Sequence, residues 1–348
     1  GMAGYTDPSS DNYGNYTYTD GSVMVFIPKF YYKVGTGSNG LAVNVIDVKG
    51  VDTYASTAAA NAAGYALHRA FIDGGEEKSG FFVDKYMCSN NGGVASSIQN
   101  GNPLSTGAAH NPISTLTVSP ANTFAGTIDA VKGRGAIFNV SSRFIYAALA
   151  ILSMAHGQGA TSADNCAWYD AGGTTNFPKG LNNNQAPSGG TISNADVNDN
   201  TVSYTSTGHA TYPNCGKTGS GTPFAKTTHN GQNSGVADLN GLMWELSLGL
   251  TRPGANATDT TNQNDATAFY VLKESVALKD LTSGWHSGAG GANYEAWGNA
   301  DHLALYYDQI TIAQITNAGT SHRFGNGANQ VLSEATSGTN WLYSGLCI

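Results

Sequence analysis

The segment HNGQNSGVADLNGLMWELSLGL, residues 229–250, carries the most specific pattern in the chain. Its first half is rich in Asn and Gly and predicts turns, whereas its second half is a compact apolar run that holds Trp244 and Glu245. We expect Trp244 in the core, Glu245 hydrogen-bonded to backbone donors, and Gly241 in a turn. A tryptophan beside a carboxylate, flanked by Gly235 and Gly241, is therefore a structural signature from which the rest of the chain can be interpreted.

The composition excludes several classes of protein. The chain has 348 residues, of which only 11% are charged, and its formal net charge is −8. It has no run of Lys and Arg of the kind that binds nucleic acid, and no apolar stretch approaches the roughly 20 residues that span a bilayer. Its 18 Tyr and 12 Phe suffice for a sizeable core. The pattern indicates a globular protein whose polar surface comes from Asn, Thr, Ser and Tyr.

The first part of the chain predicts short strands and one short helix. Residues 23–34 form a strand run and residues 41–48 form the next apolar run. Between them, residues 35–40 match GxGxxG, but no helix follows, so we expect a hairpin loop rather than a dinucleotide site. The alanine-rich residues 55–66 predict a short helix. Residues 71–90 predict a strand, a charged turn and a second strand.

The clearest helix is predicted over residues 143–156, where apolar residues recur at helical spacing. Ser141 or Ser142 is expected to cap its first turn, and Gly157 to end it. Residues 157–230 are dominated by Asn, Gly, Thr and Ser, and such a long loop-like stretch is unusual unless it is functional. The fold class predicted is α+β, with short strands, two main helices and long ordered loops and insertions.

Motifs for common chemistry are missing or incomplete. CGKT at residues 215–218 lacks the first glycine of a phosphate-binding loop, the eight His form no zinc-ligand cluster, and no GxSxG is present. A structural Ca²⁺ site is the one metal site that the sequence leaves open, because six Asp residues lie among Asn-rich loops. The alternative is that these residues form Asx turns and caps. The six are Asp164, Asp170, Asp196, Asp199, Asp238 and Asp265.

Several segments, taken in order, resemble the formylglycine-generating-enzyme branch of the C-type lectin fold. They are VMVFIPKFYYKVG (23–35), FFVDKYMCSN (81–90), the helix at 141–156 followed by NFPKG (176–180), GVADLNGLMWEL (235–246), HRFGNG (322–327) and WLYSGLCI (341–348). The resemblance implies a single C-type lectin-like domain over residues 21–348, with residues 1–20 as an N-terminal arm. A ligand-binding face would lie near the C-terminus.

The cysteines depart from that enzyme's pattern. The enzyme uses a redox-active cysteine pair near its C-terminal end, whereas here only Cys347 lies in the last third and Cys215 is far upstream. Cys88 and Cys166 are also scattered, so we expect buried thiols, with one disulfide as the alternative. We therefore expect the fold without the catalysis: no enzyme activity and no cofactor. A thiol-oxidising enzyme remains the alternative.

The chain also resembles a second group with this fold, the variable proteins of diversity-generating retroelements, which include phage receptor-binding tips of the major-tropism-determinant kind. From Trp285 onward, aromatic and small polar residues alternate with glycines, which is the composition of a paratope. The alternative is that half of these aromatic residues are core, and Trp297 and Trp341 are expected to be partly buried. The candidate ligand-binding residues are Trp285, His286, Tyr294, Asn299, Asp301, His302, Tyr306, Tyr307, His322, Arg323, Asn326 and Tyr343.

The resemblance implies noncovalent binding of a protein or glycan receptor on a cell surface, with no nucleic acid and no membrane insertion. It implies a location in a virion tail tip or at an extracellular or cell surface, and receptor-binding tips of this kind are often homo-oligomers. A carbohydrate-binding surface module is the second alternative.

Overall fold

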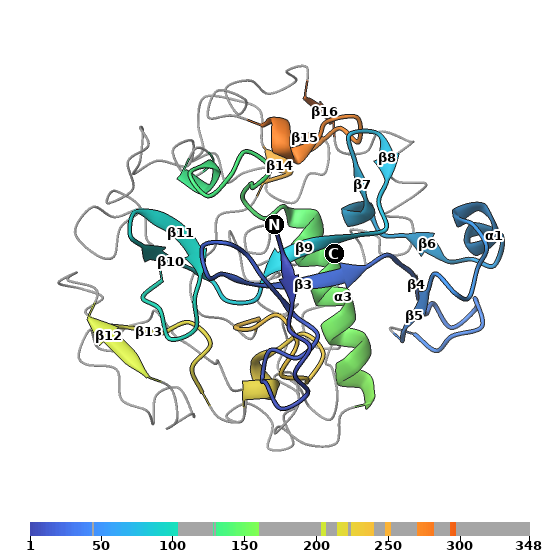
Figure 1. Cartoon of the computed structure of the whole chain (residues 1–348). Helices are drawn as coiled ribbons and strands as arrows, with labels where there is room; N and C mark the ends of the chain where they lie inside the picture. Colours follow the sequence, from blue (N-terminus) through green and yellow to red (C-terminus); the bar gives the residue numbers. More distant parts are fainter. Residues whose placement is uncertain are drawn as a thin grey trace.

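The computed structural model describes part of the chain, and Figure 1 shows how its elements are arranged. The residues that the structure describes are 1–43, 45–103, 128, 130–159, 203–206, 214–221, 224–239, 248–251, 270–281 and 293–296.

The central sheet is antiparallel and has the order β1-β2-β3-β9. Its strands are β1 (Ala3–Gly4), β2 (Tyr16–Thr17), β3 (Val23–Pro28) and β9 (Gly80–Asp84). Two strands of this sheet thus come from residues 1–20, the segment expected to be an N-terminal arm. Val25 pairs with Val83 and Phe26 with Phe82, so apolar residues alternate between the two faces of β3 and β9.

Helix α3 (Arg143–Gly159) covers one face of this sheet and forms the core with it (Figure 1). Val25, Ile27 and Val83 from the sheet belong to one buried cluster with Leu149 and Ile151 of the helix. The Ser142 hydroxyl accepts a hydrogen bond from the Ile145 N–H at 3.2 Å, so the predicted cap is confirmed.

The predicted end of the helix at Gly157 is wrong, because α3 continues to Gly159. The Gln158 side chain accepts from the Ile46 N–H at 2.6 Å and donates to the Ile46 carbonyl at 2.8 Å. These hydrogen bonds hold the last turn of the helix, and they outweigh the local preference of glycine for a helix end.

The second sheet has the order β5-β4-β6 and lies beside the first. It comprises β4 (Phe30–Val34), β5 (Ile46–Gly50) and β6 (Ala66–Leu67), with the short helix α1 (Thr57–Ala62) between β5 and β6. Strands β4 and β5 pair antiparallel, so the hairpin predicted around residues 35–40 and the helix predicted within 55–66 are confirmed.

Two details of the predicted strands differ from the structure. Residues 23–34 form two strands in different sheets, since β3 ends at Pro28, which has no N–H, and β4 begins at Phe30. Within residues 71–90, predicted as strand, charged turn and strand, the turn lies at Gly74 and Gly75, both with positive φ, and the charged Glu76 and Glu77 form a short strand. The turn joins β7 (Ile72–Asp73) to β8 (Glu76–Glu77), which follow the 3₁₀ turn η1 (Arg69–Phe71).

The remaining elements are small. They are the hairpin β10 (Cys88–Asn91) with β11 (Val94–Ser97), the pair β12 (Tyr204–Ser206) with β13 (Asn214–Gly216), the 3₁₀ turns η4 (Phe224–Thr227) and η6 (Leu278–Asp280), and the sheet β14 (Leu250–Thr251), β15 (Tyr270–Leu272) and β16 (Tyr294–Ala296). Small antiparallel sheets and few helices make the fold α+β. Among the described residues, no helix is both long and apolar enough to cross a bilayer.

Candidate functional site

One of the predicted ligand-binding residues lies within the described part of the chain. Tyr294 begins strand β16, where it pairs with Leu272 of β15. The other eleven lie outside the described residues: Trp285, His286, Asn299, Asp301, His302, Tyr306, Tyr307, His322, Arg323, Asn326 and Tyr343. Trp244 and Glu245 of the signature segment lie outside them too. The described part of the candidate site is therefore the sheet that carries Tyr294.

The three-stranded sheet β14-β15-β16 presents Tyr294 on a terminal strand. Strand β15 lies in the middle, paired antiparallel with β14 on one side and with β16 on the other. The Lys273 N–H extends the second pairing by donating to the Asn293 carbonyl at 2.9 Å. The backbone of residues 293–296 is thus held on one side by the main-chain ladder of a formed sheet.

Strand β14 is tied to the start of helix α3. The Arg143 N–H donates to the Leu248 carbonyl at 2.6 Å, and the Leu248 N–H donates to the Ser141 carbonyl at 3.1 Å. Leu248 is fully buried and belongs to a core cluster with Phe144 and Leu272. The sheet that carries Tyr294 is consequently fixed to the N-terminal turn of the longest described helix.

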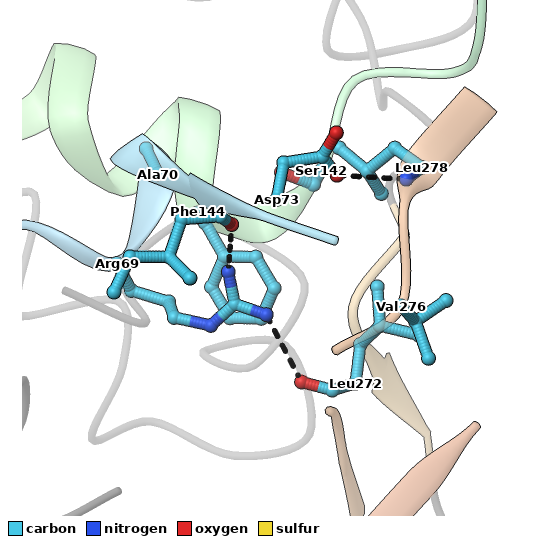
Figure 2. A pocket seen from close by; sticks show the side chains of 9 residues that line it. Arg69, Ala70, Asp73, Ser142, Phe144, Leu272, Val276 and Leu278 are labelled. Atoms are coloured by element: carbon cyan, nitrogen blue, oxygen red, sulfur yellow. Dashed lines mark hydrogen bonds between the residues drawn. The ribbon is translucent and has the colours of Figure 1, made fainter. Parts of the chain in front are cut away.

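Strand β15 is held by a buried arginine from a distant part of the sequence. Figure 2 shows the guanidinium of Arg69 lying over the Phe144 ring, with one nitrogen reaching the Leu272 carbonyl. The guanidinium carbon is 4.4 Å from the ring centroid, and Nη2 donates to Leu272 at 3.3 Å. Nη1 donates to the Ile72 carbonyl. Arg69 thereby joins η1, β7, β15 and α3 at one point.

The loop after β15 is fastened to the β7–β8 turn. The Gly75 N–H donates to the Glu274 carbonyl at 2.7 Å, and the Leu278 N–H donates to the Asp73 carboxylate at 2.8 Å. Arg69, Asp73, Ser142, Phe144 and Leu278 are among the residues that line a small cavity between these segments (Figure 2). Its empty space is about 250 Å³ including open solvent, below the roughly 300–1,000 Å³ of small-molecule sites, so this cavity does not suit a substrate.

Asp238 is the one Ca²⁺ candidate that the structure describes, and it has a structural role. It adopts φ 61°, is buried, and accepts the Gly219 N–H through both carboxylate oxygens at 2.9 and 3.3 Å. This agrees with the alternative reading of the Asp residues as turn formers. Within the described residues, no group of His, Cys, Asp and Glu side chains is arranged to hold a metal ion. Asp164, Asp170, Asp196, Asp199 and Asp265 lie outside the described residues.

Cys88 is a half-buried thiol that forms no disulfide. Its Sγ lies 3.1 Å from Oδ2 of Asp84 and so donates to a carboxylate. Cys215 lies in β13, and Cys166 and Cys347 lie outside the described residues.

A partly buried ionic network surrounds Asp84, and no sequence pattern predicted it. Arg134, with a side chain 3% exposed, places Nη1 2.8 Å from both Asp84 oxygens and Nε 3.0 Å from Asp20. Burial raises the pKa of Asp84 despite the Arg134 charge. For Asp20, burial acts to raise the pKa, but hydrogen bonds from Ser22 and Ser96 together with Arg134 lower it. The network joins β9 to the β2–β3 turn and β11.

A second buried cation, Lys85, was also missed. It follows β9 directly, is 0% exposed, and donates to the Asp11 carbonyl and to the amide oxygens of Asn12 and Asn15. The one signal in the sequence is its place in the apolar stretch FFVDKYMC, where a charge must find partners from elsewhere.

Residues 229–239, the first half of the signature segment, are closely packed. His229 is buried, and its imidazole Nδ1 accepts the Val236 backbone N–H at 3.0 Å. The backbone N–H of His229 donates to the Val236 carbonyl at 3.2 Å. A Cβ on Gly235 would lie 2.3 Å from the Asn230 amide oxygen, so this position requires glycine. Residues 229–236 thus form a closed turn that leads into the predicted signature run.

No known protein-family model matches the chain, and no curated protein shows significant similarity to it.

Proposed function

We propose that the chain is a non-catalytic binding protein that displays a variable contact surface on a C-type lectin-like scaffold of the formylglycine-generating-enzyme subgroup. Its role would be that of a diversity-generating-retroelement variable protein, in a virion tail tip or at a cell surface. Its ligand would be a protein or glycan receptor, bound noncovalently through the aromatic and polar residues of 285–343.

The observation that supports this proposal most directly is the anchoring of strand β16. Tyr294 is the first residue of that strand, and β15, its neighbour, is fixed by the buried Arg69 and by the turn at Gly75. A contact surface binds tightly when the residues beneath it are already ordered, because less conformational entropy is lost on association. Strand β16 meets this condition at Tyr294.

The chemistry of the predicted contact residues fits the same role. Tyr and Trp provide large, rigid contact areas at low entropic cost, and Asn, Ser and Gly provide adaptable hydrogen bonds. The cavity beside Arg69 is too small for a substrate, and Cys88 forms a hydrogen bond to Asp84. These features favour binding over a thiol-based reaction.

The genomic neighbourhood tests the retroelement part of the proposal. A near-copy of the 3′ coding end, differing mainly at adenines and lying beside a reverse transcriptase gene, is the expected finding. A flanking region without such a copy would overturn the retroelement role and leave a binding protein of fixed sequence.

A glycan microarray probed with the purified full chain tests the binding face. We expect Tyr306→Ala and Tyr307→Ala to weaken any glycan binding by at least about tenfold, since buried aromatic contacts dominate interfaces. Tyr13→Ala is the matched control, because Tyr13 is 52% exposed and lies in the N-terminal segment. Glycan binding that is equally strong in all three variants would contradict the proposed face, and binding abolished by Ca²⁺ chelation would favour a carbohydrate-binding module.

A further inference from the structure

A lysine and an asparagine amide meet in the interior, away from water. Lys85 is 0% exposed and Asn15 is 1% exposed, and Lys85 Nζ lies 3.0 Å from the Asn15 amide oxygen. Within the described residues Lys85 forms no ion pair with a carboxylate. A buried lysine is normally paired, so this arrangement needs an explanation.

The surroundings of Lys85 are aromatic on one side and polar on the other. Its Nζ lies 5.5 Å from the centroid of Tyr86 and 5.2 Å from that of Phe224. Across from the rings, the Asp11 carbonyl and the Asn12 amide oxygen accept from Nζ at 3.1 and 2.7 Å. These contacts fix the position of the nitrogen beside the Asn15 amide.

The Asn15 amide is fixed as well. Its Nδ2 donates to the Ser234 carbonyl at 2.7 Å, and this bond sets the plane of the amide and leaves Oδ1 toward Lys85. Since a C=O bond is about 1.2 Å long, the Asn15 carbonyl carbon lies within about 4.2 Å of Lys85 Nζ. Near-attack geometries have separations of about 3–3.5 Å, so little movement is needed.

We propose that Lys85 and Asn15 form an intramolecular isopeptide bond, in which Lys85 Nζ attacks the Asn15 carbonyl carbon and ammonia leaves. The new bond joins Nζ to the carbonyl carbon, and the bond from that carbon to Nδ2 breaks. One proton passes from Nζ to the departing Nδ2, so a primary amine and a primary amide give a secondary amide and ammonia. No oxidant or other co-reactant is required.

The environment supplies the neutral amine that this attack needs. Burial lowers the pKa of Lys85 to about 8, although the charge of Asp11 acts to raise it. Roughly a tenth of such amines are neutral at pH 7.

The choice of Asn15 over Asn12 rests on burial. Asn12 is half-exposed, whereas Asn15 is enclosed and its amide nitrogen is oriented by Ser234. The bond would close a covalent loop between two residues 70 apart in sequence and would fasten residues 1–20 to the end of β9. It would resist unfolding by constraining the unfolded chain, as any long-loop crosslink does.

Intact-mass spectrometry of the purified full chain tests the proposal. We expect a mass about 17 Da below that of the sequence, because one ammonia is lost. Trypsin should then yield residues 1–29 and 79–132 as one branched peptide, since an acylated Lys85 is not cleaved. Full mass together with separate peptides 79–85 and 86–132 would overturn the proposal and leave Lys85 as a hydrogen-bonded ammonium.

Three variants identify the two partners. Lys85→Arg keeps the charge and Asn15→Ala removes the amide, and both should restore the full mass, whereas Asn12→Ala should keep the loss. If a variant does not fold, the mass and the tryptic peptides of the wild-type chain still show whether the isopeptide bond forms. Succinimides at Asn–Gly steps such as Asn39-Gly40 also lose ammonia, but they leave no branched peptide and persist in Lys85→Arg. Fragmentation that places the branch on Asn12 would overturn the assignment to Asn15.

Discussion

Two buried histidines predict that the protein loses stability between pH 7 and pH 5. His68 is 4% exposed and its Nδ1 accepts the Ala70 N–H at 3.1 Å, and His229 is 5% exposed and accepts the Val236 N–H in the same way. Burial lowers the pKa of His68 to about 3, helped by the Arg69 charge, and that of His229 to about 4, helped by His156. Both imidazoles are therefore neutral in the folded protein at pH 5.

The size of the effect follows from the proton balance. An unfolded histidine takes up a proton near pH 6.5, so below that pH the unfolded state binds more protons than the folded state. The stabilisation is fully present above about pH 6.5 and is lost as the pH falls toward 4 and 3. Between pH 7 and pH 5 each histidine costs on the order of 2 kcal/mol, or about 4 kcal/mol together. That is a large part of the roughly 5–15 kcal/mol that stabilises a typical domain.

Urea denaturation at pH 7, 6 and 5, followed by far-UV circular dichroism, measures this loss. His68→Asn and His229→Asn keep an acceptor oxygen near the position of Nδ1, and we expect each to remove about half of the pH dependence. The comparison with wild type separates the histidines from Asp84, whose raised pKa acts in the opposite direction. An unchanged pH dependence in both variants, or NMR titration of both imidazoles near pH 6.5, would refute the reasoning.

Three further substitutions test the packing, each by urea denaturation at pH 7. Gly235→Ala should cost about 1–3 kcal/mol, since its Cβ would meet the Asn230 amide at 2.3 Å, and a loss under about 0.5 kcal/mol would mean that the side chain moves away freely. Ser142→Ala should cost about 1 kcal/mol by removing the cap of α3, and an equal stability would contradict that role. Arg69→Met should cost about 1–3 kcal/mol by leaving the buried Leu272 carbonyl without its donor, with faster amide exchange in β15 as the specific sign.

Local patterns predicted the elements that depend on local forces. Helix α3 was foreseen because its apolar residues recur every three to four positions, and the hairpin β4–β5 because two apolar runs flank a glycine-rich loop. The predictions failed where a contact with a distant residue determines the end of a helix or strand. Gln158 bonds to Ile46 and lies in a helix that continues past Gly157. The run 23–34 is divided because β3 pairs with β9, whereas β4 pairs with β5 and β6.

The sequence predicts which residue types make up the candidate site, but not the contacts that hold it in place. Composition predicts that residues 285–343 form contacts with a ligand, and Tyr294, on strand β16, is the one candidate within the described residues. Nothing in the sequence near Arg69 indicates that its side chain reaches Leu272, 203 residues away, because arginine side chains are usually exposed at the surface. Long-range contacts of this kind hold the sheet that carries Tyr294, and sequence periodicity does not reveal them.

The buried cations explain how a chain with so few charges specifies its topology. Three basic side chains lie in the interior and bond to distant residues. Arg69 bonds to Leu272, 203 positions away, Lys85 to Asn15, 70 positions away, and Arg134 to Asp84, 50 positions away. Buried ionic groups add little net stability when well paired, but removing one partner costs several kcal/mol, so an alternative register that separates them is strongly disfavoured. Short strands and Gly-rich loops specify register weakly on their own. The bonds of Lys85 to the N-terminal segment and of Arg69 to strand β15 oppose such alternative registers.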